Sequence, residues 1–307
     1  MAKPFVNPFV SGQFLELRVD ALVSDGRGLG RHDGVVVLVE DALPGQLVRA
    51  RVDAVRKSLA EAALVEVLER SPGEQEPPCP HAGRCGGCSW QSLAYGRQLA
   101  WKERIVHDAL ERVGKVACPP MLPILPSPSE WGYRNKMEFA FGVSGDGGKA
   151  LGLRERGSRN IVEVTGCLLQ TPLTMRVLEA VRMLSNGAFH DLDGRFLVVR
   201  EPNAGGCFVE LIVGAGGSLE AGERFAEALR AETPEVTGFA LSERLAPSDV
   251  AYGERALYAD GRLEERIGDV RLQMGHNAFF QVNTPAAELL YAEAARFAAL
   301  EELTDPV

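Results

Sequence analysis

The chain has 307 residues, with 33 Lys and Arg, 42 Asp and Glu, and six cysteines, which gives a net charge of −9. This length suits two or three domains, and a composition of 46% hydrophobic and 24% charged residues is typical of globular proteins. No apolar run is long enough to span a membrane, and the first residues lack a secretion signal. We therefore expect a cytoplasmic protein without a membrane partner, whose cysteines are metal ligands or reactive thiols.

The acidic excess is concentrated in the last part of the chain. Residues 171–307 carry 12 basic and 22 acidic side chains, whereas the window 134–159 carries six basic and three acidic ones. A polyanion could bind to this window despite the negative net charge. A solvated strand face is the other interpretation of the same pattern.

Residues 14–69 are predicted to form a small all-β barrel of the OB kind. Turn signals such as Asp25-Gly26 and Pro44-Gly45 separate short segments with alternating or continuous apolar residues. Their spacing of about ten residues is typical of small barrels. Four strands are expected, over 15–21, 35–39, 48–54 and 62–68.

The segment Gly26-Arg27-Gly28-Leu29-Gly30 has the look of part of a dinucleotide-binding loop. That function would require a helix after the glycines, but an apolar strand pattern follows them. We interpret the segment as a flexible loop on the barrel in which Arg27 and Arg31 contact a phosphate backbone.

The remainder of the chain is predicted to be α+β. A helix is expected over 92–114, and the five prolines of 118–129 indicate a linker. Strands dominate from Lys136 to Met274, including a β pair over 195–200 and 207–213. Three further helices are expected near 172–186, 219–231 and 286–300.

Three cysteines lie close together in a turn-rich loop, in the pattern Cys79-x5-Cys85-Gly-Gly-Cys88. Thiolates at this density suit zinc or an iron–sulfur cluster, and the spacing does not separate the two. A fourth ligand would come from elsewhere in the chain. The candidates are His81, Cys118, Cys167 and Cys207.

Five blocks of this sequence, in order, resemble the S-adenosylmethionine-dependent RNA (uracil-C5)-methyltransferases. The branch is the one with an N-terminal TRAM barrel and a [4Fe–4S] cluster, which includes the 23S rRNA enzymes. The blocks are the barrel segment 14–69, the array Cys79-x5-Cys85-Gly-Gly-Cys88, Tyr133-Arg134-Asn135-Lys136-Met137-Glu138-Phe139, Ile161-Val162-Glu163-Val164-Thr165-Gly166-Cys167 and Phe279-Phe280-Gln281-Val282-Asn283.

The resemblance implies specific roles for these residues. Cys167 would be the fourth cluster ligand, and Gln281 would contact S-adenosylmethionine. Beyond the resemblance, the residue types make Phe279 a candidate for stacking on a base or for a core aromatic, and they make Arg134 and Lys136 candidates for phosphate or base contacts. The expected partner is RNA, ribosomal or transfer, and no DNA is expected.

The resemblance also implies a multi-domain organisation. The expected domains are a TRAM barrel over 1–70, an iron–sulfur α+β domain over 71–275 and the start of a Rossmann-like methyltransferase domain over 276–307. A helix extended over 92–116 would dock on the methyltransferase domain. Residues 284–307 contain none of that domain's glycine-rich, nucleophile or base motifs. We therefore expect a chain without its own catalytic residues, inactive by itself.

Two other interpretations remain. The chain could be a non-catalytic iron–sulfur RNA-binding module, or a zinc-bound protein associated with the ribosome. The first shares every residue with the methyltransferase reading and differs from it only in whether an S-adenosylmethionine domain follows in the intact gene or is supplied by another chain. Zinc in a colourless preparation would favour the second.

Overall fold

A computed structural model describes residues 7–214 and 217–298 of the chain. Its contacts divide the chain into two compact units. The first runs to Gly83 and continues over Cys88–Pro126, and the second comprises Arg84–Gly87 and the residues from Ser127 onward. No helix among the described residues is long and apolar enough to cross a membrane.

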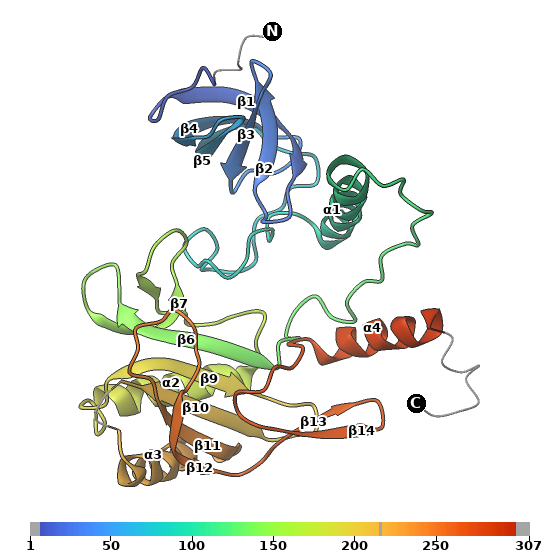
Figure 1. Cartoon of the computed structure of the whole chain (residues 1–307). Helices are drawn as coiled ribbons and strands as arrows, with labels where there is room; N and C mark the ends of the chain where they lie inside the picture. Colours follow the sequence, from blue (N-terminus) through green and yellow to red (C-terminus); the bar gives the residue numbers. More distant parts are fainter. Residues whose placement is uncertain (1–6, 215–216, 299–307) are drawn as a thin grey trace. The chain divides into compact units, whose positions relative to one another are not determined.

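The first unit is built on a closed five-stranded barrel (Figure 1). Alternation sets its inside, because Leu15, Leu17 and Val19 of the first strand are buried while their neighbours face outward. The strand order is β1-β2-β3-β5-β4, with β3 and β5 parallel and the other pairs antiparallel. The strands are β1 (Phe14–Leu22), β2 (Gly28–His32), β3 (Val35–Glu40), β4 (Leu47–Val55) and β5 (Leu59–Glu69).

From Gly28 onward the glycine-rich segment is a strand of the barrel and not a flexible loop, which corrects the sequence-based interpretation, while Gly26 and Arg27 lie in the turn before β2. A Cβ atom on Gly30 would lie 2.4 Å from the Arg18 carbonyl oxygen and 2.8 Å from Leu17 Cδ1. A Cβ on Gly28 would lie 2.7 Å from the Ala42 carbonyl oxygen. These glycines are needed because β2 packs against neighbouring backbone too closely for any side chain.

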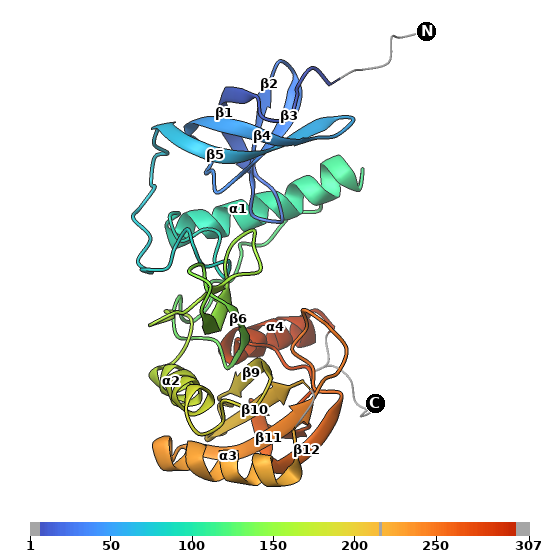
Figure 2. The ribbon, with the colours of Figure 1, turned by 90° about the vertical axis from the view of Figure 1, so that its left-hand side faces the viewer.

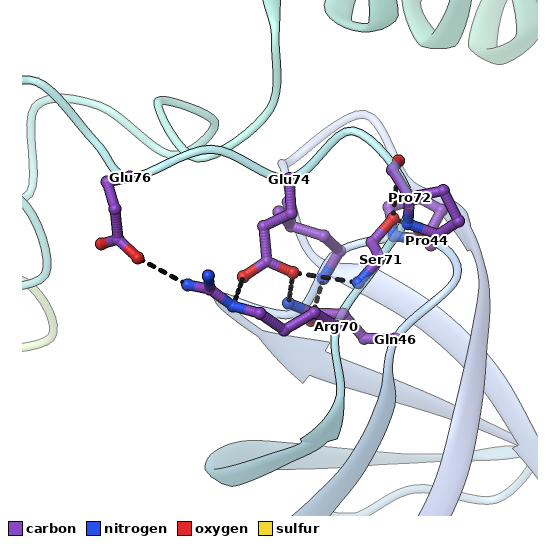
Figure 3. A network of polar contacts seen from close by, with 8 residues as sticks. Pro44, Gln46, Arg70, Ser71, Pro72, Glu74 and Glu76 are labelled. Carbon is purple, nitrogen blue, oxygen red and sulfur yellow. Dashed lines mark hydrogen bonds and ion pairs between the residues drawn. The ribbon is translucent and has the colours of Figure 1, made fainter.

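A polar network fixes the chain where it leaves the barrel (Figure 3). One carboxylate oxygen of Glu74 accepts hydrogen bonds from Gln46 Nε2 at 2.8 Å and from the Ser71 backbone N–H at 3.0 Å. The other oxygen lies 3.2 Å from Arg70 Nε, and Arg70 also pairs with Glu76. Because the Glu74 side chain is only 9% exposed, this network ties the end of β5 firmly to the start of β4.

The helix after the cysteine loop packs on the barrel. It comprises α1 (Tyr95–Asp108) and one π-helical turn, η1 (Ala109–Val113). It is shorter than the predicted 92–114 because Leu93 lies in a preceding turn, buried with Leu22 and Leu43. Trp101 and Ile105 join this cluster, so α1 belongs to the same compact unit as the barrel, and this unit extends to Pro126.

The second unit contains a seven-stranded sheet in the order β12-β11-β10-β9-β6-β7-β8 and a separate hairpin, β13-β14. Only β10 and β11 are parallel in the larger sheet. The strands are β6 (Lys136–Val143), β7 (Lys149–Arg154), β8 (Ile161–Val162), β9 (Gly194–Arg200), β10 (Cys207–Val213), β11 (Val236–Glu243), β12 (Arg255–Asp260), β13 (Leu263–Ile267) and β14 (Val270–Met274).

Two helices, α2 (Pro172–Asn186) and α3 (Leu219–Glu232), cover one face of this sheet (Figure 2). Thr171 and Ser218 are the N-caps of these helices, because their side-chain oxygens accept hydrogen bonds from backbone N–H groups of the first turn. Every residue of β10 is buried, so its other face is covered too, in part by Ala251. A fourth helix, α4 (Thr284–Phe297), follows the hairpin, and contacts place residues 276–298 in the same unit as the sheet.

Candidate functional site

Two of the sequence blocks, 133–139 and 279–283, meet at the side chain of Asn135. Its Nδ2 donates hydrogen bonds to Thr284 Oγ1 at 2.8 Å and to the Gln281 carbonyl oxygen at 3.1 Å. Its backbone N–H donates to the Val282 carbonyl oxygen at 2.9 Å. Asn135, just before β6, therefore fixes the segment that leads into α4.

A buried carboxylate lies on the other side of Asn135. Glu265, in β13, is 1% exposed, and its Oε2 accepts from Asn135 Nδ2 at 3.2 Å. Its Oε1 accepts from the backbone N–H groups of Asn203 at 2.9 Å and Arg266 at 3.1 Å. Burial raises the pKa of Glu265, and these hydrogen bonds oppose the rise because they favour the charged form.

Arg200 holds the same segment further upstream. This residue ends β9, is 5% exposed and donates from Nη2 to the Ala278 carbonyl oxygen at 2.7 Å. Burial lowers the pKa of Arg200, and nearby carboxylates such as Glu210 oppose this effect. The segment 278–284 is thus attached at Ala278 and again at Gln281 to Thr284.

Between these two attachments the segment presents two of the predicted site residues. Phe279 is 83% exposed, so it is available for stacking and is not a core aromatic. Gln281 is partly exposed. A fixed backbone that displays an exposed ring and an amide suits a site that binds a planar or polar ligand.

The first turn of α4 is fixed by two polar side chains, Asn283 and Thr284. Asn283 is the N-cap, because its Oδ1 accepts from the Ala286 N–H at 3.1 Å. Its Nδ2 donates to Ser127 Oγ at 3.0 Å. Thr284 is the first helical residue, and its hydroxyl oxygen accepts a hydrogen bond from Asn135 Nδ2.

The structure shows where the basic residues predicted to contact RNA lie, and their contact with RNA stays a prediction. In the first unit Arg27 pairs with Asp25 at 2.7 Å, and Arg31 is exposed on β2. In the second unit Arg134 is partly exposed, and Lys136 pairs with Glu138.

The basic window 134–159 is also partly neutralised by the acidic part of the chain. Arg154 and Arg159 lie 3.2 and 3.6 Å from the two carboxylate oxygens of Asp249. The excess of positive charge in this window is therefore smaller than the sequence suggests, and phosphate contacts there would compete with Asp249.

The four predicted cluster ligands are divided between the units. Cys79 and Cys88 lie in the first, Cys85 and Cys167 in the second, and all four are partly buried. Among the described residues, no three His, Cys, Asp or Glu side chains come together as a metal site. The structure therefore does not assemble the predicted cluster, which stays a prediction.

The segment around Cys85 is nevertheless well ordered by local bonds. The Gly87 N–H points to Cys85 Sγ at 3.4 Å, an interaction that favours a thiolate. The Gly86 N–H donates to the Arg154 carbonyl oxygen at 3.0 Å, and the Arg156 N–H donates to the Arg84 carbonyl oxygen at 2.8 Å. These bonds hold residues 84–87 beside the end of β7.

Sequence reasoning missed Glu265 and Arg200. Both lie in strands with no unusual composition, and their partners are 130 and 78 residues away in the sequence. Glu265 could have been found from the alternation in its strand. Leu263, Glu265 and Ile267 occupy the same face, so alternation assigns this charged residue to the interior.

The first unit matches the model of a known domain family. Residues 8–65 match the TRAM domain, which confirms the predicted N-terminal barrel.

Relatives of the whole chain are named as uncharacterised RNA methyltransferases. The chain is 45% identical to one from Nitratidesulfovibrio vulgaris, covering 95% of this chain and 65% of the relative. It is 31% identical to one from Caldanaerobacter subterraneus subsp. tengcongensis, covering 96% of this chain and 67% of the relative.

A solved structure shares the fold at 23% identity with a TM-score of 0.67. It is the tRNA (uracil-54, C5)-methyltransferase of Pyrococcus abyssi in complex with S-adenosyl-L-homocysteine, and the likeness covers 91% of this chain and 64% of that chain. The second unit is therefore included as well as the barrel. The chain spans about two thirds of the length of these proteins. The comparisons do not confirm the expectation that the methyltransferase domain is only begun here.

Proposed function

The chain belongs to the RNA methyltransferases with an N-terminal TRAM domain, and from that premise we propose that it binds RNA for S-adenosylmethionine-dependent methylation of uridine at C5. We place this activity in the cytoplasm, with ribosomal RNA as the first candidate substrate and transfer RNA as the second. The proposal goes beyond the names of the relatives, which do not specify the base.

The observation that carries the proposal is the hydrogen-bonded centre at Asn135. It joins the two sequence blocks that resemble uridine methyltransferases, although they lie 146 residues apart at the Asn135–Gln281 contact. A chance resemblance of two short segments would not require them to meet in space. Their meeting supports a common role in one binding site.

The roles of individual residues follow from their exposure. Phe279, with most of its ring exposed, would stack on an extruded base, since stacking on aromatic rings is how proteins hold unpaired bases. Gln281 would hydrogen-bond to S-adenosylmethionine, which when bound supplies the methyl group. Asn135 and Arg200 are positioning residues, because they hold the backbone of this segment and not the ligand.

The chain of 307 residues should bind RNA weakly and methylate nothing by itself. The resemblance implies a thiolate nucleophile, but burial raises the pKa of Cys207 to about 12, so this thiol is not ionised at neutral pH. The test is incubation with labelled S-adenosylmethionine and either ribosomal or transfer RNA. The Pyrococcus abyssi enzyme on transfer RNA serves as the positive control. Labelled 5-methyluridine made at a catalytic rate would contradict this expectation.

The expectation that the chain binds RNA weakly is tested by a separate measurement. Phosphate contacts by residues such as Arg31 and Arg134 release counterions, so the affinity should fall steeply with salt. We expect a Kd of about 10⁻⁶ to 10⁻⁴ M at physiological salt, in the non-specific range, because residues 171–307 are acidic. An affinity that does not change with salt would show that phosphates are not the target.

We further propose that Cys79, Cys85, Cys88 and Cys167 bind a [4Fe–4S] cluster. The four thiols and the N–H···S interaction at Cys85 suit such a cluster chemically. Protein purified without oxygen should contain about four irons and four sulfides per chain. Cys167→Ala should lose the iron, whereas Cys207→Ala should keep it, because Cys207 is a fully buried core residue. Stoichiometric zinc without visible absorbance would favour the zinc-protein alternative instead.

A further inference from the structure

Two arginines of the second unit converge on one exposed carboxylate. Nη2 of Arg154, at the end of β7, lies 3.2 Å from Asp249 Oδ1, and Nη2 of Arg159 lies 3.6 Å from Asp249 Oδ2. The side chains of Arg159 and Asp249 are 87% and 66% exposed, and that of Arg154 is 38% exposed. Both guanidinium groups can therefore be reached from solvent, and both bind the same anionic group.

The turn that carries the two arginines is held in shape by its own hydrogen bonds. Arg154 Nη1 donates to the Arg159 carbonyl oxygen at 2.9 Å. The Glu155 N–H donates to the Asn160 carbonyl oxygen at 2.9 Å. Glu155 Oε2 accepts from Ser158 Oγ at 2.7 Å and from Asn160 Nδ2 at 3.0 Å. Because bonds within the turn fix its backbone, an anion between the two arginines requires no rearrangement of the chain around it.

Asp249 is a weakly attached occupant of this position. It lies in the segment 244–254, which joins β11 to β12 without regular secondary structure. Ala251 packs against the sheet and anchors the segment, whereas the Asp249 side chain extends into solvent. Ion pairs between exposed side chains contribute little to stability, because water screens the two charges. A polyanion can therefore displace this carboxylate by rotation of the Asp249 side chain.

We infer that Arg154 and Arg159 form a phosphate-binding site for the RNA backbone, and that Asp249 fills this site when no RNA is bound. A phosphodiester and a carboxylate both present two anionic oxygens, and guanidinium groups bind both through N–H···O contacts. Two guanidinium groups around one carboxylate keep a net positive charge, so the site attracts phosphate while Asp249 is in place. Because Asp249 must leave as the phosphate enters, it is a built-in competitor that lowers the affinity for RNA.

The inference rests on the proposed RNA-binding function and adds a local reason for weak affinity. The acidic composition of residues 171–307 opposes RNA binding in general, whereas Asp249 competes at one defined place. Removal of single negative charges separates the two effects. A general effect follows the net charge wherever an exposed charge is removed, whereas competition is confined to Asp249.

The test compares the affinities of the full chain and its variants for fluorescently labelled transfer RNA over a series of salt concentrations. Asp249→Asn keeps the shape of the side chain and removes its charge. We expect this variant to bind about two- to fivefold more tightly at physiological salt, the range of exposed ion pairs. The slope of log K against log salt should steepen by about 0.7–0.9, because the site then presents one more positive charge to the phosphates.

Two further variants separate competition from a change of net charge. Arg159→Gln in the Asp249→Asn background should remove most of the gain, whereas Arg154 is kept because it also holds the turn. Glu235→Gln removes an equal charge and releases one arginine, Arg176, from a half-exposed pair, so it should change the affinity by less than about twofold. The unfolding temperatures should stay near that of the wild type, because every replaced side chain is exposed.

Three outcomes would overturn this inference while leaving RNA binding intact. They are an unchanged affinity in Asp249→Asn, an equal gain in Glu235→Gln, and a gain that survives Arg159→Gln. If inorganic phosphate, added at constant ionic strength, displaced the RNA from Asp249→Asn, the site would serve free phosphate and not the RNA backbone. No binding of transfer RNA to the wild type or to any variant would contradict the proposed function as well.

Discussion

Gly30→Ala should destabilise the barrel by about 2–3 kcal/mol or more, because the new Cβ would lie 2.4 Å from the Arg18 carbonyl oxygen. That oxygen belongs to β1, which pairs with β2 at this point, so it cannot move without disturbing the barrel. The melting temperature of the first unit should fall by roughly 10 °C or more. Thermal unfolding followed by circular dichroism measures this change.

Gly96→Ala is the control in the same unit. Gly96 lies within α1, and a Cβ there would meet no atom within 4 Å. The substitution should therefore be neutral or stabilise the helix by up to about 1 kcal/mol. If Gly30→Ala melted like the wild type but lost affinity for RNA, the glycines would act as the phosphate-binding loop that the sequence suggested, and the packing explanation would be wrong.

The contrast between strands with apolar side-chain patterns and a strand of packed glycines explains which elements of the barrel could be predicted from the sequence. Strands β1 and β4 were predictable because alternating apolar residues mark a buried face, and β3 was predictable because its residues form a continuous apolar run. The strand β2 was not, because glycines carry no side-chain pattern and are read as turns. The second unit contains a similar glycine. A Cβ on Gly217, before α3, would lie 2.5 Å from Leu257 Cδ1, so close packing accounts for a glycine there as well.

The candidate site was predictable only in part, and for a different reason. Resemblance singled out Phe279 and Gln281, but no periodicity or spacing connects Asn135 with Glu265. A contact between residues 130 positions apart depends on which strands become neighbours, and local patterns do not contain that information. The cysteine array was predictable by spacing, while its assembly into one metal site depends on the placement of two separate units.

Asn135→Asp should destabilise the second unit strongly, with a loss of roughly 3–5 kcal/mol at pH 7. The new carboxylate would stand about where Nδ2 now lies, 3.2 Å from Glu265 Oε2, and would face the Gln281 carbonyl oxygen without a proton to donate. Favourable contacts with the buried Glu265 and with the partly buried Gln281 carbonyl would become repulsive or unpaired. Chemical denaturation of the variant and the wild type measures the difference.

The size of this loss should depend on pH in a defined direction. Two adjacent buried carboxylates raise the pKa of one of them above its unfolded value. Such a group contributes its full stability below the unfolded pKa, about 4, and loses it as the pH rises through the higher folded pKa. The deficit relative to wild type should therefore be smallest near pH 4 and largest at neutral pH. A deficit that stayed constant with pH would mean that lost hydrogen bonds, and not charge repulsion, cause it.

Asn160→Asp provides the matched control for burial. Asn160 Nδ2 also donates to a carboxylate, Glu155 Oε2 at 3.0 Å, but the contact is exposed. The same substitution there should cost less than about 1 kcal/mol, because water screens the two charges. A similar loss at both positions would show that burial of the Asn135 centre has little importance.

A double substitution tests whether Asn135 and Glu265 act as a pair. Asn135→Asp together with Glu265→Gln exchanges the amide and the carboxylate, so an N–H···O contact between them can form again in the opposite sense. The double variant should be more stable than Asn135→Asp alone, with a coupling energy of about 1–3 kcal/mol. The part of the pH dependence that comes from repulsion between two carboxylates should disappear, because only one carboxylate remains.

The exchange should not restore wild-type stability. The introduced aspartate still cannot donate to the Gln281 carbonyl oxygen, and the introduced glutamine cannot accept from the N–H groups of Asn203 and Arg266 as well as a carboxylate does. Additive losses from the two substitutions would mean that each residue holds the 278–284 segment independently, because coupled partners give non-additive changes in the free energy of unfolding. The interpretation of Asn135 and Glu265 as one positioning centre would then fail.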